Sequence, residues 1–291
     1  MESLRRFTGS DIDFDYSALS GIPLHSIGVV CESLRQRFKK QTLIQQANEE
    51  WMVRTHFSVK MLLSATVMFT SQQFAAAHAL KIVEPYLLYY SLLNTSRALV
   101  FLIPEEPWSD GALLENVTHT KVINVTADQL RYLSTSTAEK YKQIAKQALA
   151  VREFFSYKFP ASGLEGSLSE FLPSDIDVLE LCRFIGEVAQ LYSECLETEF
   201  RPYASPYGAF SDYPLRRFFE YPHKFLPEPI EDDEDYWRLG HLLRKVGAPI
   251  CLRKTATDGL VEDFMAAWDS GDETKGQYRP KLCDWGLIFS F

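Results

Sequence analysis

The sequence has few cysteines, and none of them is paired. Its five cysteines are scattered along the chain, and no two form a Cys-x-x-Cys motif. The six histidines do not gather at the spacing of metal ligands either. Disulfide frameworks and structural zinc sites need such groupings. We therefore expect reduced thiols, as in the cytoplasm, and a protein that uses no metal ion and no other cofactor.

The sequence is also short of positive charge. Thirty lysines and arginines stand against 39 acidic residues, which gives a net charge of −9. Proteins that bind nucleic acid over a broad surface need a basic one. The composition therefore argues against broad, non-specific binding, but it leaves room for a small basic site that acts on RNA.

No long uninterrupted apolar run is present. Residues 1–16 contain no apolar stretch of the kind that a secretory signal needs. The most apolar segment, Tyr86–Ile103, is interrupted near its middle by Asn94 and Arg97. A charged side chain at that depth of a bilayer would be costly. We expect a cytoplasmic protein without a membrane partner, in which this segment is a buried helix.

The short motifs of several common enzyme classes are missing as well. The chain contains no G-x-G-x-x-G, no G-x-x-x-x-G-K-[ST], no H-E-x-x-H and no G-x-S-x-G. These absences argue against dinucleotide binding, P-loop nucleotide hydrolysis, zinc proteolysis and serine hydrolase chemistry.

What the sequence does contain is helical periodicity, which predicts a mostly α-helical fold with few short strands. Residues 57–75 fit either a strand or a buried helix, because periodicity alone does not separate the two. The β-branched residues of 117–126 indicate a loop or short strand. Ser136 and Glu139 form a capping box in front of one helix. Helices are expected at 24–40, 43–51, 86–103, 137–157, 174–200, from 231 onward and at 258–269.

The composition changes near residue 201. The segment 201–230 is rich in aromatic residues and proline, and proline disfavours a regular helix. The segment is too apolar for a flexible linker, so we expect it to lie extended across the helical body of residues 1–200. Residues 201–291 are then a C-terminal elaboration packed on that body, either as a second domain or as part of a single one.

The residues that carry the most chemistry lie between Glu84 and Asn124. Ser91, Asn94 and Arg97 follow one another at intervals of three residues in the apolar helix and so form a polar line. His119 and Lys121 follow on a segment that must return close to this helix. A cleft with these side chains would suit a phosphate-bearing ligand.

A purely structural role for Arg97 stays open beside this prediction. A buried arginine usually pairs with an acid, because an unpaired buried charge is costly. Glu84, Glu105 and Glu106 are the acids within reach along the chain.

The helix and the segment after it resemble the YaaC-like proteins of the HEPN superfamily. The resemblance covers about residues 40–160 and rests on a P-x-L-L-x-Y motif, a basic position at Arg97 and the histidine His119. The motif residues are Pro85, Leu87, Leu88 and Tyr90. HEPN proteins have a helical fold, and many act as dimeric, metal-independent ribonucleases of toxin or antiviral systems. They carry an R-x(4–6)-H motif, whereas here no histidine follows Arg97 at that distance, so His119 would have to approach it in space.

The resemblance implies a bacterial RNA-cleaving toxin or anti-phage effector. His119 would act as the general acid or base, since histidine titrates near neutral pH. Arg97 would stabilise charge on the phosphate. Asn94 would orient the phosphate, and Lys121 would hold a neighbouring one, with Ser91 in the same line.

Two other functions remain open from the sequence. The first is a non-catalytic helical interaction or sensor subunit of a bacterial defence or regulatory complex, in which the segment 201–230 clasps a protein partner or a second copy of the chain. The second is a sensor that binds a small molecule or nucleotide in the cleft of Arg97.

Overall fold

The computed structural model of the chain describes residues 2–43, 47–108, 117–159, 161, 170–204, 218–221, 225, 227–269, 278–280 and 284–290. Within these residues the protein is mostly α-helical, which confirms the predicted fold class. The helices are α1 (Glu2–Thr8), α2 (Leu24–Gln41), α3 (Ala47–Ala77), α4 (Glu84–Phe101), α6 (His119–Arg131), α7 (Thr135–Tyr157), α8 (Asp175–Phe200), α10 (Asp233–Val246), α11 (Leu252–Thr255) and α12 (Asp258–Ala267), with a 3-10 turn η3 (Arg201–Tyr203).

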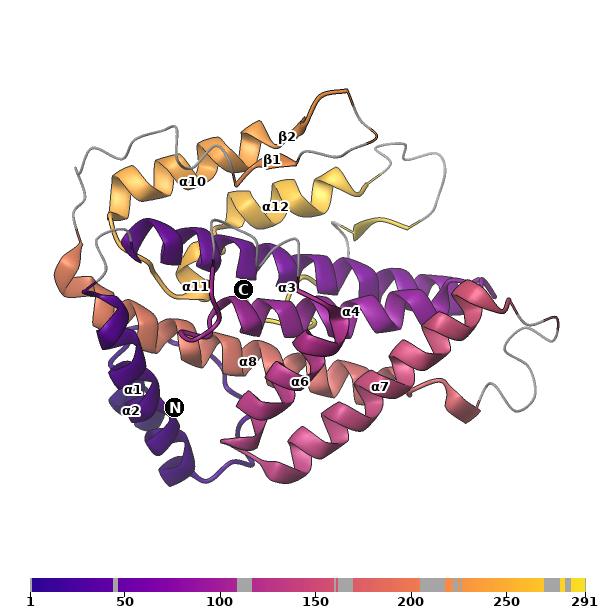
Figure 1. The fold of residues 1–291 in the computed structure, drawn as a ribbon, viewed down its shortest axis with the longest axis horizontal. Helices are drawn as coiled ribbons and strands as arrows, with labels where there is room; N and C mark the ends of the chain where they lie inside the picture. Colours follow the sequence, from indigo (N-terminus) through magenta and orange to yellow (C-terminus); the bar gives the residue numbers. More distant parts are fainter. Residues whose placement is uncertain are drawn as a thin grey trace.

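Helices α3 and α4 form the centre of the fold. They lie side by side, with α10 and α12 on one side of the pair and α6 and α7 on the other (Figure 1). Helix α8 also packs against α4. Residues 57–75, which fit either a strand or a helix from the sequence, belong to helix α3. The same helix includes most of the residues of the separate helix expected at 43–51.

Helix α6 replaces the loop or short strand predicted for residues 117–126, so that prediction is wrong. The side chain of Thr118 accepts a hydrogen bond from the backbone N–H of Lys121 and caps the helix. Val122, Thr126 and Leu130 then recur at spacings of four and are buried. Burial of this stripe outweighs the weak β preference of its branched residues.

The start of α7 also differs in detail from the predicted capping box. The cap is Ser134, whose hydroxyl accepts from the backbone N–H of Thr137, and the helix begins two residues earlier than expected. Position 136 lies inside the first turn. Two serines in the same turn make the choice of cap ambiguous from sequence.

The C-terminal region packs on the helical body. Three buried side chains of α8 accept hydrogen bonds from the first backbone N–H groups of α11: Glu197 from Cys251, Ser193 from Leu252 and Gln190 from Arg253, all at 2.9–3.0 Å. The first N–H groups of a helix have no acceptor within the helix itself, and here the side chains of α8 supply the acceptors. The short strands β1 (Glu220–Tyr221) and β2 (Ile230–Glu231) pair in antiparallel fashion. Most of the segment expected to be extended, including 205–217, lies outside the described residues.

Among the helices that the structure describes, none has the length and apolar character needed to cross a membrane. The apolar helix α4 instead buries its hydrophobic side chains against the neighbouring helices of the core.

Arg54 of α3 is the most heavily engaged buried cation of the described core. Its side chain is 2% exposed and lies between the rings of Trp51 and Trp108, with the guanidinium carbon 4.4 and 5.1 Å from the ring centroids. The guanidinium donates to the backbone carbonyls of Phe101, Ile103 and Glu106, which form the end of α4 and the turn after it. Its charge is paired with Glu50 at 2.7 Å. One side chain thus joins α3 to the end of α4.

Replacing Arg54 by leucine should destabilise the protein strongly. The change leaves three carbonyls without their donor and Glu50 without its partner, and such losses cost about 3 kcal/mol. Chemical denaturation measures the change in the free energy of unfolding. Arg131→Leu is the matched control, because Arg131 forms an exposed pair with Asp128 on α6. Equal effects of the two substitutions would contradict the role given to Arg54.

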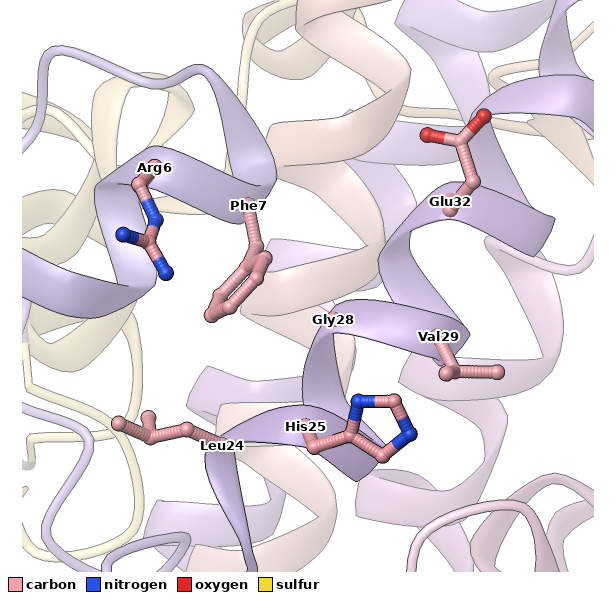
Figure 2. A pocket seen from close by; sticks show the side chains of 7 residues that line it. All are labelled: Arg6, Phe7, Leu24, His25, Gly28, Val29 and Glu32. Carbon is pink, nitrogen blue, oxygen red and sulfur yellow. The ribbon is translucent and has the colours of Figure 1, made fainter.

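Helix α1 packs on α2 at a glycine. The ring of Phe7 points from α1 toward Gly28 on α2 (Figure 2). A Cβ atom at position 28 would lie 2.7 Å from the Cε1 atom of that ring, which is closer than real contacts allow. The small residue therefore permits the close approach of the two helices.

The substitution Gly28→Ala should lower the free energy of unfolding by about 1 kcal/mol. Overpacking against Phe7 costs about 1–3 kcal/mol, and the better helix propensity of alanine offsets about 1 kcal/mol. Thermal unfolding followed by circular dichroism would show the shift. Gly21→Ala is the control, since a Cβ at that position meets nothing within 4 Å. A Gly28→Ala protein at least as stable as the control would refute this account.

Candidate functional site

Arg97 is a half-buried cation of α4 that has no ionic partner among the described residues. Burial lowers the pKa of its guanidinium, and the groups that oppose this shift are the phenols of Tyr89 and Tyr90 rather than a carboxylate. None of the hydrogen bonds or ion pairs within the described part of the chain involves this side chain. An unpaired guanidinium in such a place is a binding group for an anion.

The acids considered as partners of Arg97 are engaged elsewhere. Glu105 pairs with Arg37 of α2, and Glu106 pairs with Lys121 at 2.6 Å. Glu84 lies near Lys81 and Asp175, whose charges act on the pKa of its carboxyl group. The purely structural alternative, in which Arg97 pairs with one of these three glutamates, is therefore not what the structure shows.

His119 is the first residue of α6 and lies close to Arg97. Its Nδ1 atom is 2.7 Å from the hydroxyl oxygen of Tyr89, which holds the ring in place. Partial burial lowers the pKa of the imidazole, and the positive charges of Arg97 and Arg152 lower it further. Glu153 acts in the opposite direction. At neutral pH the imidazole is therefore neutral, with Nε2 left for a ligand.

Arg152 of α7 completes the group, and sequence reasoning missed it. Its Nη2 atom donates to the hydroxyl of Tyr90 at 3.0 Å, and its guanidinium lies 5.9 and 5.7 Å from the ring centroids of Tyr89 and Tyr90. Its Nε atom is buried without a hydrogen-bond partner. The only hint in the sequence is an arginine beside the apolar residues Val151 and Phe155 of the same helix, which does not reveal what α7 packs against.

We call the group formed by these side chains the Arg97 cluster; its members are Tyr89, Tyr90, Arg97, His119 and Arg152. Two guanidinium groups, one neutral imidazole and two phenols come together from α4, α6 and α7. Within the described part of the chain, neither the buried Nε of Arg152 nor the guanidinium of Arg97 has an acceptor. A phosphate group supplies such acceptors and carries the complementary charge.

The remaining predicted site residues lie apart from the Arg97 cluster. Ser91 is fully buried and donates to the carbonyl of Leu88, and Asn94 donates to the hydroxyl of Ser64 on α3. The reason is helix geometry: three residues turn a helix by about 300°, so each step of the predicted polar line drifts by about 60°. From Ser91 to Arg97 the drift is about 120°, and the line therefore leaves one face.

Lys121 also turns away from the predicted ligand site. Its ammonium group forms the ion pair with Glu106 at 2.6 Å, so its charge is already compensated. The function expected of Lys121 and Asn94, to hold and orient phosphate, is available to Arg152 instead. Among the described residues no three histidine, cysteine or acidic side chains lie close enough together to hold a metal ion.

Comparison of the chain with protein-family models, with curated proteins and with solved structures found no match. The resemblance to the YaaC-like proteins therefore stays a prediction that depends on the residues quoted for it, and the site is interpreted from its own chemistry.

Removing the charge of Arg97 should raise the pKa of His119. The positive charge of Arg97 disfavours the imidazolium form, so Arg97→Gln makes protonation easier. The titration of the His119 ring protons by NMR in the two proteins gives both pKa values. Arg131→Gln, at the other end of α6, should leave the value unchanged. A pKa that falls or does not move in Arg97→Gln would show that the two side chains are not coupled.

Proposed function

We propose that the protein binds RNA through a phosphate at the Arg97 cluster and cleaves it without a metal ion. The observation that carries this proposal is the guanidinium of Arg97, which has no ionic partner among the residues that the structure describes, next to a neutral histidine, His119. Charge stabilisation and proton transfer are the two functions that cleavage of RNA by its own 2′-hydroxyl requires. In line with the resemblance, we place such an activity in a bacterial toxin or antiviral system.

The proposed reaction begins with proton transfer. In the tautomer whose Nδ1–H donates to the oxygen of Tyr89, His119 accepts the proton of the 2′-hydroxyl at Nε2. The 2′-oxygen then attacks the adjacent phosphorus atom, and the bond from phosphorus to the 5′-oxygen breaks. The proton on Nε2 passes to the departing 5′-oxygen. The products are a 2′,3′-cyclic phosphate and a free 5′-hydroxyl.

The two arginines stabilise the charge that develops in this reaction. As the 2′-oxygen adds to phosphorus, negative charge grows on the non-bridging oxygens, and the guanidinium groups of Arg97 and Arg152 can bind them. Bound phosphate also offsets the positive charges that lower the pKa of His119. Binding of the substrate thus prepares His119 to hold the proton that it must later donate.

A second function is supported by the scarcity of titrating groups in the Arg97 cluster. Burial raises the pKa of Tyr89 above its ordinary value, so this phenol is a poor proton donor to a leaving group. Histidine is then the only side-chain type in the Arg97 cluster whose ordinary pKa lies near neutral pH. A sensor or interaction subunit of a defence or regulatory complex would bind a phosphate-bearing ligand without cleaving it. Such a protein needs no second titrating group beside His119.

Cleavage of an end-labelled RNA oligonucleotide in the presence of EDTA tests the proposal. We expect His119→Ala to lower the rate at least about 100-fold with little loss of RNA binding, because it removes the acid and base. Arg97→Ala should weaken both binding and cleavage. The cleaved fragment should end in a 2′,3′-cyclic phosphate, and DNA of the same sequence should stay intact.

The control for these variants is Arg131→Ala, which removes an exposed cation from the same helix as His119. Circular dichroism checks that each variant is folded. Cleavage by His119→Ala at the wild-type rate would refute the enzymatic proposal. Binding of RNA by the wild-type protein without any cleavage, lost in Arg97→Ala, would favour the sensor.

A further inference from the structure

A cavity lies on the opposite side of the α3–α4 pair from α6 and α7. It has a volume of about 370 Å³ and lies where α10, α11 and α12 cross α3. Figure 1 shows α10 and α12 next to each other over α3. None of its lining residues belongs to the Arg97 cluster. The lining residues are His56, Trp237, Arg238, His241, Leu242, Thr255, Thr257 and Leu260.

The floor of this cavity is polar and deeply buried. His56 of α3 is 2% exposed, and its Nε2 atom lies 3.3 Å from a carboxylate oxygen of Asp235. Asp235 is in turn paired with Lys60. Thr255 is also buried and donates its hydroxyl proton to backbone carbonyls, so its oxygen can still accept. The floor therefore offers the hydroxyl oxygen of Thr255 as an acceptor, beside the imidazole of His56.

The arginine in the lining of this cavity is already paired with an acid. Arg238 is the one lining side chain that is always ionised, and it is paired with Asp263 of α12. Leu242 and Leu260 form apolar walls from α10 and α12. A charged ligand would lose its hydration here without gaining a counter-charge, which is costly. The cavity therefore suits an uncharged ligand.

The rim is aromatic. Trp237 is 60% exposed although it borders the cavity, and His241 lies one helical turn further along α10. Exposed indole rings next to a cavity are surfaces on which flat rings stack. Most small-molecule sites combine such apolar and aromatic surfaces with a few polar groups that fix the orientation.

We propose that this cavity binds an uncharged, planar heteroaromatic molecule. The molecule would stack on Trp237 at the rim, contact Leu242 and Leu260, and direct a ring nitrogen or an amino group toward His56 and Thr255 at the floor. The size of the cavity fits one or two fused rings. This site is independent of the proposed cleavage of RNA.

Isothermal titration of the full-length protein with adenine, which is uncharged at neutral pH, tests this proposal. We expect adenine to bind with a Kd of about 0.1–1 mM, as for a ligand of its size. Benzoate, a planar anion, should bind at least about tenfold more weakly. Trp237→Ala should weaken the binding of adenine about tenfold.

Two control variants make the outcome specific. Trp268→Ala removes an equally exposed indole that does not line the cavity, and Arg97→Ala alters the other site; both should bind adenine as the wild type does. No heat of binding with wild-type protein, equal affinity for benzoate, or equal effects of Trp237→Ala and Trp268→Ala would each overturn the proposal. Loss of binding in Arg97→Ala would also do so, because adenine would then occupy the Arg97 cluster.

Discussion

The buried guanidinium of Arg54 fixes the end of α4 relative to α3, and the arrangement of the rest of the molecule depends on that junction. Three carbonyls at the end of α4 and in the turn after it converge on this one side chain, which two tryptophans cover. The chain leaves this turn toward α6, whose first residue is His119. At the start of α6, the hydrogen bond between His119 and Tyr89 holds the imidazole against the same helix α4.

The Arg97 cluster stays positively charged in an acidic protein because the nearby carboxylates are paired with other cations. Glu105 and Glu106 lie close to the end of α4, but Arg37 and Lys121 engage them. Because these carboxylates are engaged, Arg97 and Arg152 lie beside Tyr89 and Tyr90 and have no carboxylate partner among the described residues. A net charge of −9 is compatible with such a site, because a single phosphate group is bound by local donors and not by the field of the whole surface.

Much of the fold could be read from local signals. Pro85 and Pro104 bracket α4, and the acidic residues before α10 mark its start, because both act within one helical turn. Residues 57–75 could not be assigned, because α3 is buried nearly all round and has no polar face to set its period. Helix α6 was missed because its stability comes from burial and a threonine cap, whereas its composition suggests a strand.

The candidate site was predictable only in part. Arg97 stands out in sequence as a charge inside an apolar helix, and His119 as the histidine that must return to it. Arg152 could not be found, since its relevance depends on which face of α7 packs against α4. Ser91 and Asn94 were grouped with Arg97 by spacing alone, and the rotation of the helix separates them.

The interlocking of α3 with α4 has a consequence for the order of folding. The two helices are neighbours in sequence, and Arg54 closes a loop of about 50 residues when it reaches the end of α4, so this hairpin can form early. The pairing of Lys60 with Asp232 closes a loop of more than 170 residues. The C-terminal helices therefore dock on a hairpin that is already formed. The cavity above His56 exists only once these helices have docked, because α10, α11 and α12 supply its walls.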